Sequence, residues 1–372
     1  METKKRIDYF DLARGVGIIL VILGHIEYIP RGLRTYIISF HMPLFFIISG
    51  MLLMINREAE RDTKQLFSKK LKNIMYPYCY FSVIDIIVYI IYFLLTGRDG
   101  GWQTVLMDAI QSVTLYGMTV LWFLPALFIS ELLLLILIKK FSKLAPVIVA
   151  AIFLAALFLN NILQAQNQLY GNRAWFAVFY MIALMIVRAL ICMFFVGFGY
   201  GFAWLWSRLP AISPTTFTPY STAANLLIGV NLLVVLFFLS RLNPSVDLHY
   251  CIFGNPFIFF PAAVIGSLGL IFTCKSTELI KNRKLVFPLK YLGKNSLIIM
   301  LTHLDLYILY VSEVFAMHFN KYISTEFGAP FNIMIVVFVL IAEVFVIEII
   351  NRYFPFLIGK PKKKLPPVER KL

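Results

Sequence analysis

Residues 9–29 read YFDLARGVGIILVILGHIEYI, an apolar stretch that carries only four acidic, basic or imidazole side chains. A helix of about 20 such residues is long enough to cross a hydrocarbon core roughly 30 Å thick. Because this stretch and others like it are continuous rather than alternating in polarity, a membrane β-barrel is excluded. We therefore expect an all-α polytopic membrane protein of about ten transmembrane helices, near 9–29, 36–55, 74–96, 118–138, 145–160, 189–206, 220–240, 255–274, 295–316 and 331–351.

The composition indicates a protein whose main solvent is lipid. Of its 372 residues, 60% are hydrophobic and only 14% are charged, whereas soluble proteins carry roughly 25% charged residues. The net charge of +15 is unevenly distributed, because 26 of the 34 Lys and Arg fall in alternate segments between the expected spans. The positive-inside rule assigns these segments to the cytoplasm. Both termini are therefore predicted to be cytoplasmic, and the basic charge requires no nucleic-acid partner.

The expected spans form one membrane domain over residues 1–351, followed by a basic cytoplasmic tail over 352–372. Two further apolar stretches, 104–117 and 174–187, have only 14 residues each and are expected to be interfacial or re-entrant pieces. The four cysteines are scattered, and the histidines are dispersed without an HExxH sequence. Neither a disulfide framework nor a metal site is expected.

The first span places ionisable groups inside the membrane, where they are costly and suggest function. Arg14 and His25 are eleven residues apart. This spacing is three helical turns plus about 20°, so the two side chains share one helix face and are separated by roughly 16 Å along the axis. Arg14 lies near the expected cytoplasmic end and His25 near the outer end. The alternatives are an Asp11–Arg14 pair or an arginine that reaches the inner headgroups, and a histidine that only packs.

The second span opens with FHMPLFFIISG over residues 40–50. His41 enters from the outside about as deep as His25 lies in its own span, so two imidazoles on consecutive antiparallel helices could face one cavity. Pro43 falls in the first helical turn, where its missing N–H costs little. Ser49 and Gly50 are also residues small enough to let neighbouring helices approach closely.

These blocks resemble the acyltransferase-3 family of bacterial integral membrane acyltransferases. The resemblance covers nearly the whole chain and rests on Asp11, Arg14-Gly15 and His25, on FHMPLFF at 40–46 with Ser49-Gly50, on LWFL at 121–124, on Phe194-Phe195 with Gly197, and on YLGKNSL at 291–297 with Thr302-His303. The residue order of the first two blocks is especially similar to that of the branch named for fucose 4-O-acetylases.

The resemblance implies transfer of an acyl group, expected to be acetyl, from cytoplasmic acyl-CoA to a hydroxyl of a cell-surface or lipid-linked glycan. It also implies a multi-pass protein of the cytoplasmic (inner) membrane of a bacterium. His25 is assigned as general base, because an imidazole pKa of about 6.5 lies near the operating pH. A covalent acyl-histidine is the alternative to direct attack by the acceptor. His41 is the second catalytic candidate and either hydrogen-bonds the acceptor, orients the catalytic pair or only packs. The remaining assignments are Arg14 and Asp11 to donor binding, and Ser49, Trp122 and His303 to the substrate cavity.

Two other functions fit the same residues. An exporter or flippase of a glycan or small anion would line its path with charged side chains in the same way. A binding or sensory module is a further alternative, because the same membrane domain occurs fused to other enzymes. Acyl transfer by the purified protein distinguishes an enzyme from both alternatives.

Overall fold

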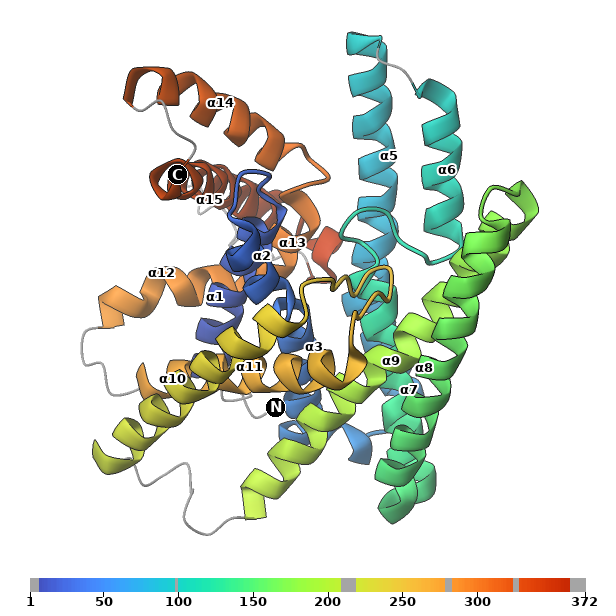
Figure 1. Ribbon diagram of the computed structural model, residues 1–372, viewed down its shortest axis with the longest axis vertical. Coiled ribbons are helices and arrows are strands. Elements are labelled where there is room, and N and C mark those ends of the chain that lie inside the picture. The colour runs from blue at the N-terminus through green and yellow to red at the C-terminus, as the bar shows by residue number, and fades with distance from the viewer. Residues whose placement is uncertain (1–6, 98–99, 209–218, 278–282, 324–327, 362–372) are drawn as a thin grey trace, which may run out of the picture.

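The computed structural model describes residues 7–97, 100–208, 219–277, 283–323 and 328–361 (Figure 1). Helix makes up 85% of the structure, and the described ranges contain no strand. Both observations confirm the all-α class. The helices, in chain order, are α1 (Asp8–His25), α2 (Arg31–Ile38), α3 (His41–Ile55), α4 (Thr63–Lys70), α5 (Tyr76–Thr96), α6 (Gly101–Val113), α7 (Phe123–Phe141), α8 (Ala145–Tyr170), α9 (Ala174–Arg208), α10 (Pro219–Leu242), α11 (Pro256–Ser276), α12 (Arg283–Lys294), α13 (Ser296–Thr302), α14 (Ile308–Ile323) and α15 (Ala329–Tyr353).

Seven helical segments of the described ranges are long and apolar enough to cross a membrane. They are Arg31–Ile55, Thr63–Thr96, Phe123–Tyr170, Ala174–Arg208, Thr222–Leu242, Pro256–Ser276 and Ala329–Tyr353. Phe123–Tyr170 contains both α7 and α8, which are separated by the short 3₁₀ turn Ser142–Leu144. The fold is therefore that of a multi-pass membrane protein, while the count of ten crossings and the side on which the termini lie stay predictions.

The stretch 174–187 differs from its expected interfacial or re-entrant form. It is the first part of α9, a continuous helix of 35 residues. No proline interrupts the sequence between Ala174 and Arg208, so nothing in the backbone forces an end after residue 187. The other short stretch, 104–117, begins within α6 and continues into a loop, and α6 packs against α5.

The expected ninth span, 295–316, is not one helix. It is broken into α13 and α14 by the turn His303–Tyr307. Tyr307 has a φ of 57°, in the left-handed region that non-glycine residues rarely adopt. The amide of Leu309 returns to the carbonyl of His303 at 2.9 Å and closes the turn. The break matters for the site because His303 and Tyr307 lie at its two ends.

Close backbone contacts at glycine join the helices that carry the site. A Cβ atom on Gly50 of α3 would lie 1.9 Å from the carbonyl oxygen of Val196 in α9, and one on Gly199 would lie 2.1 Å from that of Ile47. The same holds between α1 and α12, where a Cβ on Gly15 would lie 1.9 Å from the oxygen of Leu289. Small residues permit such approach between membrane helices, so α1 and α3 are held firmly in place.

The chain after α15 folds back onto the bundle before the described ranges end. Pro355–Ile358 forms a short 3₁₀ helix, and the ring of Phe356 lies 5.6 Å from that of Tyr80 in α5. Pro355 and Ile358 are buried. The expected tail, 352–372, thus begins as part of the folded domain, and its residues from 362 onward lie outside the described residues.

Candidate active site

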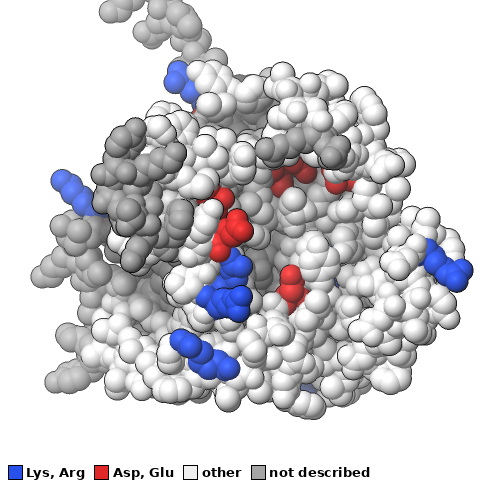
Figure 2. All heavy atoms as spheres, turned by 45° about the horizontal axis from the view of Figure 1, so that its top comes forward, with Lys and Arg blue, Asp and Glu red and all other residues white. Residues whose placement is uncertain are grey.

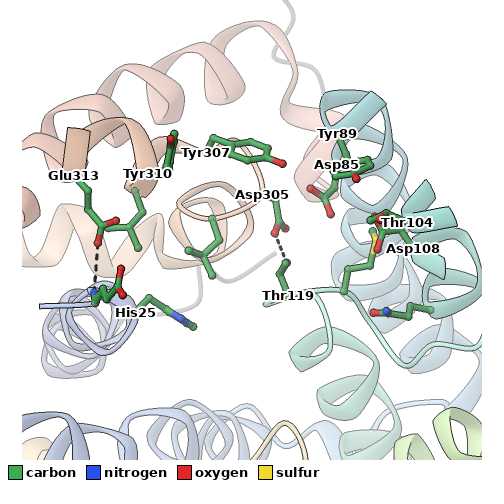
Figure 3. Close-up of a pocket in the computed structure, with 15 residues that line it drawn as sticks. His25, Asp85, Tyr89, Thr104, Asp108, Thr119, Asp305, Tyr307, Tyr310 and Glu313 are labelled. Atoms are coloured by element: carbon green, nitrogen blue, oxygen red, sulfur yellow. Dashed lines mark hydrogen bonds between the residues drawn. The ribbon is translucent and has the colours of Figure 1, made fainter. Parts of the chain in front are cut away.

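A cavity of about 620 Å³ opens between α5 and α6 on one side and the end of α1 with α14 on the other (Figure 3). His25, the last residue of α1, lies in its wall with its side chain exposed to the cavity. Opposite it stand Asp85 of α5 and Asp108 of α6. Asp305, from the turn between α13 and α14, lies between these two sides. The cavity is therefore built from four separate parts of the chain.

His303 lies directly beside His25, and their ring centroids are 5.5 Å apart with the planes tilted by 51°. Its side chain is fully buried. Nδ1 of His303 donates to the carbonyl oxygen of Ile299 at 2.8 Å, since that oxygen can only accept. This fixes the neutral tautomer with a bare Nε2, and Nε2 has no hydrogen-bond partner among the described residues. An unpartnered basic nitrogen thus lies beside His25.

His41 approaches the same point from α3. It is the first residue of that helix and is buried, and its Nδ1 donates to the carbonyl oxygen of Ile37 at 3.0 Å. His25 interacts electrostatically with both His41 and His303. The structure therefore brings three imidazoles from α1, α3 and the end of α13 to one place, and two of them are held by the carbonyl four residues earlier.

Arg14 and Asp11 lie near the N-terminal end of α1, whereas His25 is its last residue. Because α1 is continuous from Asp8 to His25, the eleven residues between Arg14 and His25 place them roughly 16 Å apart along the axis. Asp11 is buried and Arg14 is half-buried. Neither lines the cavity that contains His25.

Ser49 does not lie in the cavity either. It is eight residues beyond His41 on α3, roughly 12 Å deeper, and its hydroxyl donates to Glu131 of α7. Lys70 bridges Glu131 at 2.6 Å and Glu58 at 2.9 Å, and Lys69 also contacts Glu58. Although burial alone would raise it, the ammonium groups of Lys70 and Lys69 hold the pKa of Glu58 below its ordinary value. We call Ser49, Glu131, Lys70, Glu58 and Lys69 the inner network.

Trp122 belongs to a third cluster, outside the cavity. Its ring stacks on His249 at 5.5 Å with planes 4° apart, and the Arg188 guanidinium lies 5.1 Å from its centre. Arg188 is fully buried and donates to the carbonyl oxygens of His249, at 2.8 Å, and of Tyr116. Burial, and then the charge of Arg188, lower the pKa of His249 to about 3. This cluster ties together the loops after α6 and α10.

The cavity also contains residues to which the sequence assigned no role. Asp85, Asp108, Thr119 and Tyr307 all line it, and burial raises the pKa of the Asp108 carboxyl. One sequence signal was available, because Asp85 is an acidic residue within an apolar span, and such residues suggest function. Within the described ranges, no three or more His, Cys, Asp and Glu side chains group as metal ligands would.

The fold and the site define the class of protein. It is a helical membrane protein with clustered imidazoles beside a polar cavity. The acyltransferase-3 family model, described as an acyltransferase domain, matches residues 7–352. The chain therefore belongs to the acyltransferase-3 family. The match extends from the start of α1 to the end of α15 and includes His25, His41 and His303. No curated protein and no solved structure matches the chain.

Proposed function

We propose that the protein transfers an acyl group, in the simplest case acetyl, from cytoplasmic acyl-CoA to a hydroxyl of a glycan on the outer side of the membrane. The family supports an acyltransferase. The observation that carries the finer proposal is that His25 lines a cavity of about 620 Å³ and has the buried ring of His303 5.5 Å behind it. That cavity has room for a sugar residue, and an acceptor bound there would lie next to His25.

His25 acts as the general base in this proposal. It takes the proton of the acceptor hydroxyl while that oxygen forms a bond to the acyl carbon and the carbon–sulfur bond breaks. The proton then goes to the departing thiolate, so that His25 returns to its neutral form. The bare Nε2 of His303 favours the charged intermediate form of His25, because it can accept a hydrogen bond from the imidazolium. His41 completes the group of imidazoles through its electrostatic interaction with His25.

The donor supplies an activated acyl carbon and a thiol leaving group, and the chain has cationic groups suited to its phosphates. Lys64, Lys69 and Lys72 surround an open hollow of about 540 Å³ at α4, in a segment expected to be cytoplasmic. Lys64 is exposed, as is Lys72. Arg14 lies between this side and His25 along α1. We infer that Lys64 and Lys72 hold the phosphates, since Lys69 is already paired with Glu58. Arg14 then guides the acyl arm toward the histidines.

The test is turnover of acetyl-CoA by the purified protein in lipid nanodiscs, measured as free thiol released in the presence of a glycan extract. We expect His25→Ala to lower the rate by about a hundredfold to ten-thousandfold, the range typical of a lost general base. His318→Ala is the matched control, because His318 is exposed on α14 and lies outside the cavity. It should retain the wild-type rate.

Two results would contradict the proposal. One is a folded His25→Ala protein that releases thiol as fast as wild type, which would remove His25 from the chemistry. The other is a wild-type protein that releases no thiol with any glycan but moves a labelled glycan across proteoliposomes. The latter result would establish the exporter or flippase in place of the enzyme.

A further inference from the structure

The ionisable side chains that line the cavity, apart from His25 and the tyrosines, are acidic. Five carboxylates line it, namely those of Glu27, Asp85, Asp108, Asp305 and Glu313, and no Lys or Arg is among the described residues that line it. In Figure 3 Asp85, Asp108 and Asp305 lie around the same space. Figure 2 shows acidic side chains near the middle of this face, with basic side chains directly beside some of them. A ligand in the cavity therefore meets carboxylates on several sides.

Asp305 has an oxygen that is free to bind a ligand. Its side chain is 3% exposed, and one oxygen accepts a hydrogen bond from the hydroxyl of Thr119. The other oxygen, Oδ2, has no partner among the described residues. A buried carboxylate oxygen without a donor is costly. Its position in the cavity wall suits a ligand that brings a donor, such as a hydroxyl.

Tyrosines supply flat apolar surface beside these acceptors. Tyr307 stacks on Tyr92 of α5 with centroids 5.0 Å apart and planes 21° apart, and Tyr89 and Tyr310 also line the cavity. Carboxylate oxygens beside aromatic rings match a sugar residue, which presents hydroxyl donors at its rim and C–H groups on its faces. Tyr307 is held across the space by the turn that breaks α13 from α14 (Figure 3).

Arg34 lies beside this site and offsets part of its negative charge. Arg34 interacts electrostatically with His25 but does not line the cavity. Its guanidinium donates to the carbonyl oxygens of Ile26 and Glu27. Arg34 therefore secures the chain after α1, and it is one cation next to five acidic side chains in the cavity wall.

We propose that this cavity selects its acceptor by charge: it binds a sugar residue that carries no anionic group and excludes uronic acids and phosphorylated sugars. A uronate carboxylate entering the cavity would add a further negative charge among these acidic groups, and like-charge repulsion would oppose its binding. Neutral hydroxyls would instead donate to Asp305, Asp85 and Asp108. This inference rests on the proposed function only for the identity of the cavity as the acceptor site.

The test measures binding in the absence of any donor. Saturation-transfer NMR is recorded on the protein in phosphatidylcholine nanodiscs with methyl glucoside, galactoside and mannoside, each paired with its uronate. We expect at least one neutral glycoside to bind. The affinity of its uronate should be lower by about tenfold or more. Asp305→Asn and Asp108→Asn should each lower the ratio of neutral-glycoside affinity to uronate affinity severalfold. Two variants are used in case one does not fold. Glu60→Gln, which neutralises an exposed carboxylate outside the cavity, should leave the ratio unchanged.

The inference is overturned if a uronate binds as well as its neutral partner, or if none of the six glycosides binds. It is also overturned if Glu60→Gln changes the ratio as much as Asp305→Asn does. Failure of the proposed function gives a different result, in which the neutral glycoside binds selectively but is never acylated when acetyl-CoA is added.

Discussion

The cavity and the inner network both bury ionisable groups, but they treat them in opposite ways. In the inner network each charge faces its opposite, with Lys70 2.6 Å from Glu131 and 2.9 Å from Glu58. In the cavity carboxylates face one another, and Oδ2 of Asp305 has no partner among the described residues. The same holds for Nε2 of His303, which is buried beside His25. Burial of a charged side chain is thus a poor guide to function by itself. An unpartnered polar atom at a cavity wall is a better one.

The difference has an energetic reason. Removing one partner of a buried ion pair leaves an uncompensated charge and is strongly destabilising, although the intact pair gains little over apolar packing. An unpartnered buried nitrogen or oxygen costs stability in the native protein. We therefore expect substitutions in the inner network to lower stability, and substitutions in the cavity to lower activity without lowering stability.

The largest effect is expected from Lys70→Met, which leaves the buried carboxylates of Glu131 and Glu58 without their shared ammonium group. We expect a loss of about 3–5 kcal/mol of folding free energy, measured as a lower melting temperature in detergent. The rate of thiol release per folded molecule should stay near that of wild type, because the network does not line the cavity.

A second variant separates charge from shape. Lys70→Met combined with Glu131→Gln removes the carboxylate that is left without a cation, since Glu58 keeps Lys69. The double variant should therefore recover part of the lost melting temperature. If the double variant is no more stable than Lys70→Met, the network acts through packing, and the comparison with the cavity loses its electrostatic basis.

The next effect is on activity. His303→Leu removes the bare Nε2 next to His25, and we expect the rate to fall about a hundredfold. The melting temperature should stay the same or rise, because a buried unpartnered polar atom is removed. The carbonyl of Ile299 keeps a donor, since it also accepts from the backbone amide of His303 at 3.1 Å. His318→Leu is the control for loss of an exposed imidazole. A His303→Leu protein with wild-type activity would assign His303 to packing alone.

Sequence patterns predicted the helical class because apolar runs of spanning length are direct evidence of membrane helices. They did not predict the break at 303–307, because neither glycine nor proline occurs in HLDLY. The left-handed conformation of Tyr307 is imposed by tertiary packing and has no local signal. The continuity of α9 was missed for the opposite reason, since the polar run before residue 174 suggested a short separate piece.

The candidate site was predictable only in part. Helical spacing placed Arg14 and His25 on one face of a single helix, and depth suggested that His41 could meet His25. Spacing within a helix does not show what lies opposite, so the carboxylates of α5 and α6 were not assigned to the cavity. Ser49 and Trp122 illustrate the same limit, because their partners Glu131 and Arg188 lie 82 and 66 residues along the chain.

The cluster of Trp122, His249 and Arg188 extends the comparison to the effect of pH on stability. The pKa of His249 is about 3 in the folded protein and 6.5 in the unfolded chain, so below pH 6.5 the unfolded chain binds more protons and is favoured. Acidification from pH 6.5 to 5 should therefore destabilise the fold, with about 1–2 kcal/mol attributable to His249. His249→Phe retains a ring on Trp122 and should show a correspondingly smaller loss of melting temperature between these pH values. Equal losses in the two proteins would assign the acid sensitivity to other groups.

The smallest effect is expected from Thr119→Val, which keeps the branched shape but removes the hydroxyl that donates to Asp305. We expect the KM for a neutral acceptor to rise about fivefold, the value of one hydrogen bond of roughly 1 kcal/mol, with kcat little changed. Thr114→Val is the matched control, because the Thr114 hydroxyl donates to the carbonyl of Ile110 and Thr114 does not line the cavity. An equal effect of Thr114→Val would mean that the loop, rather than Asp305, governs the acceptor. A fall in kcat with KM unchanged would place Asp305 in the chemical step instead of in binding, since only an interaction specific to the transition state lowers kcat alone.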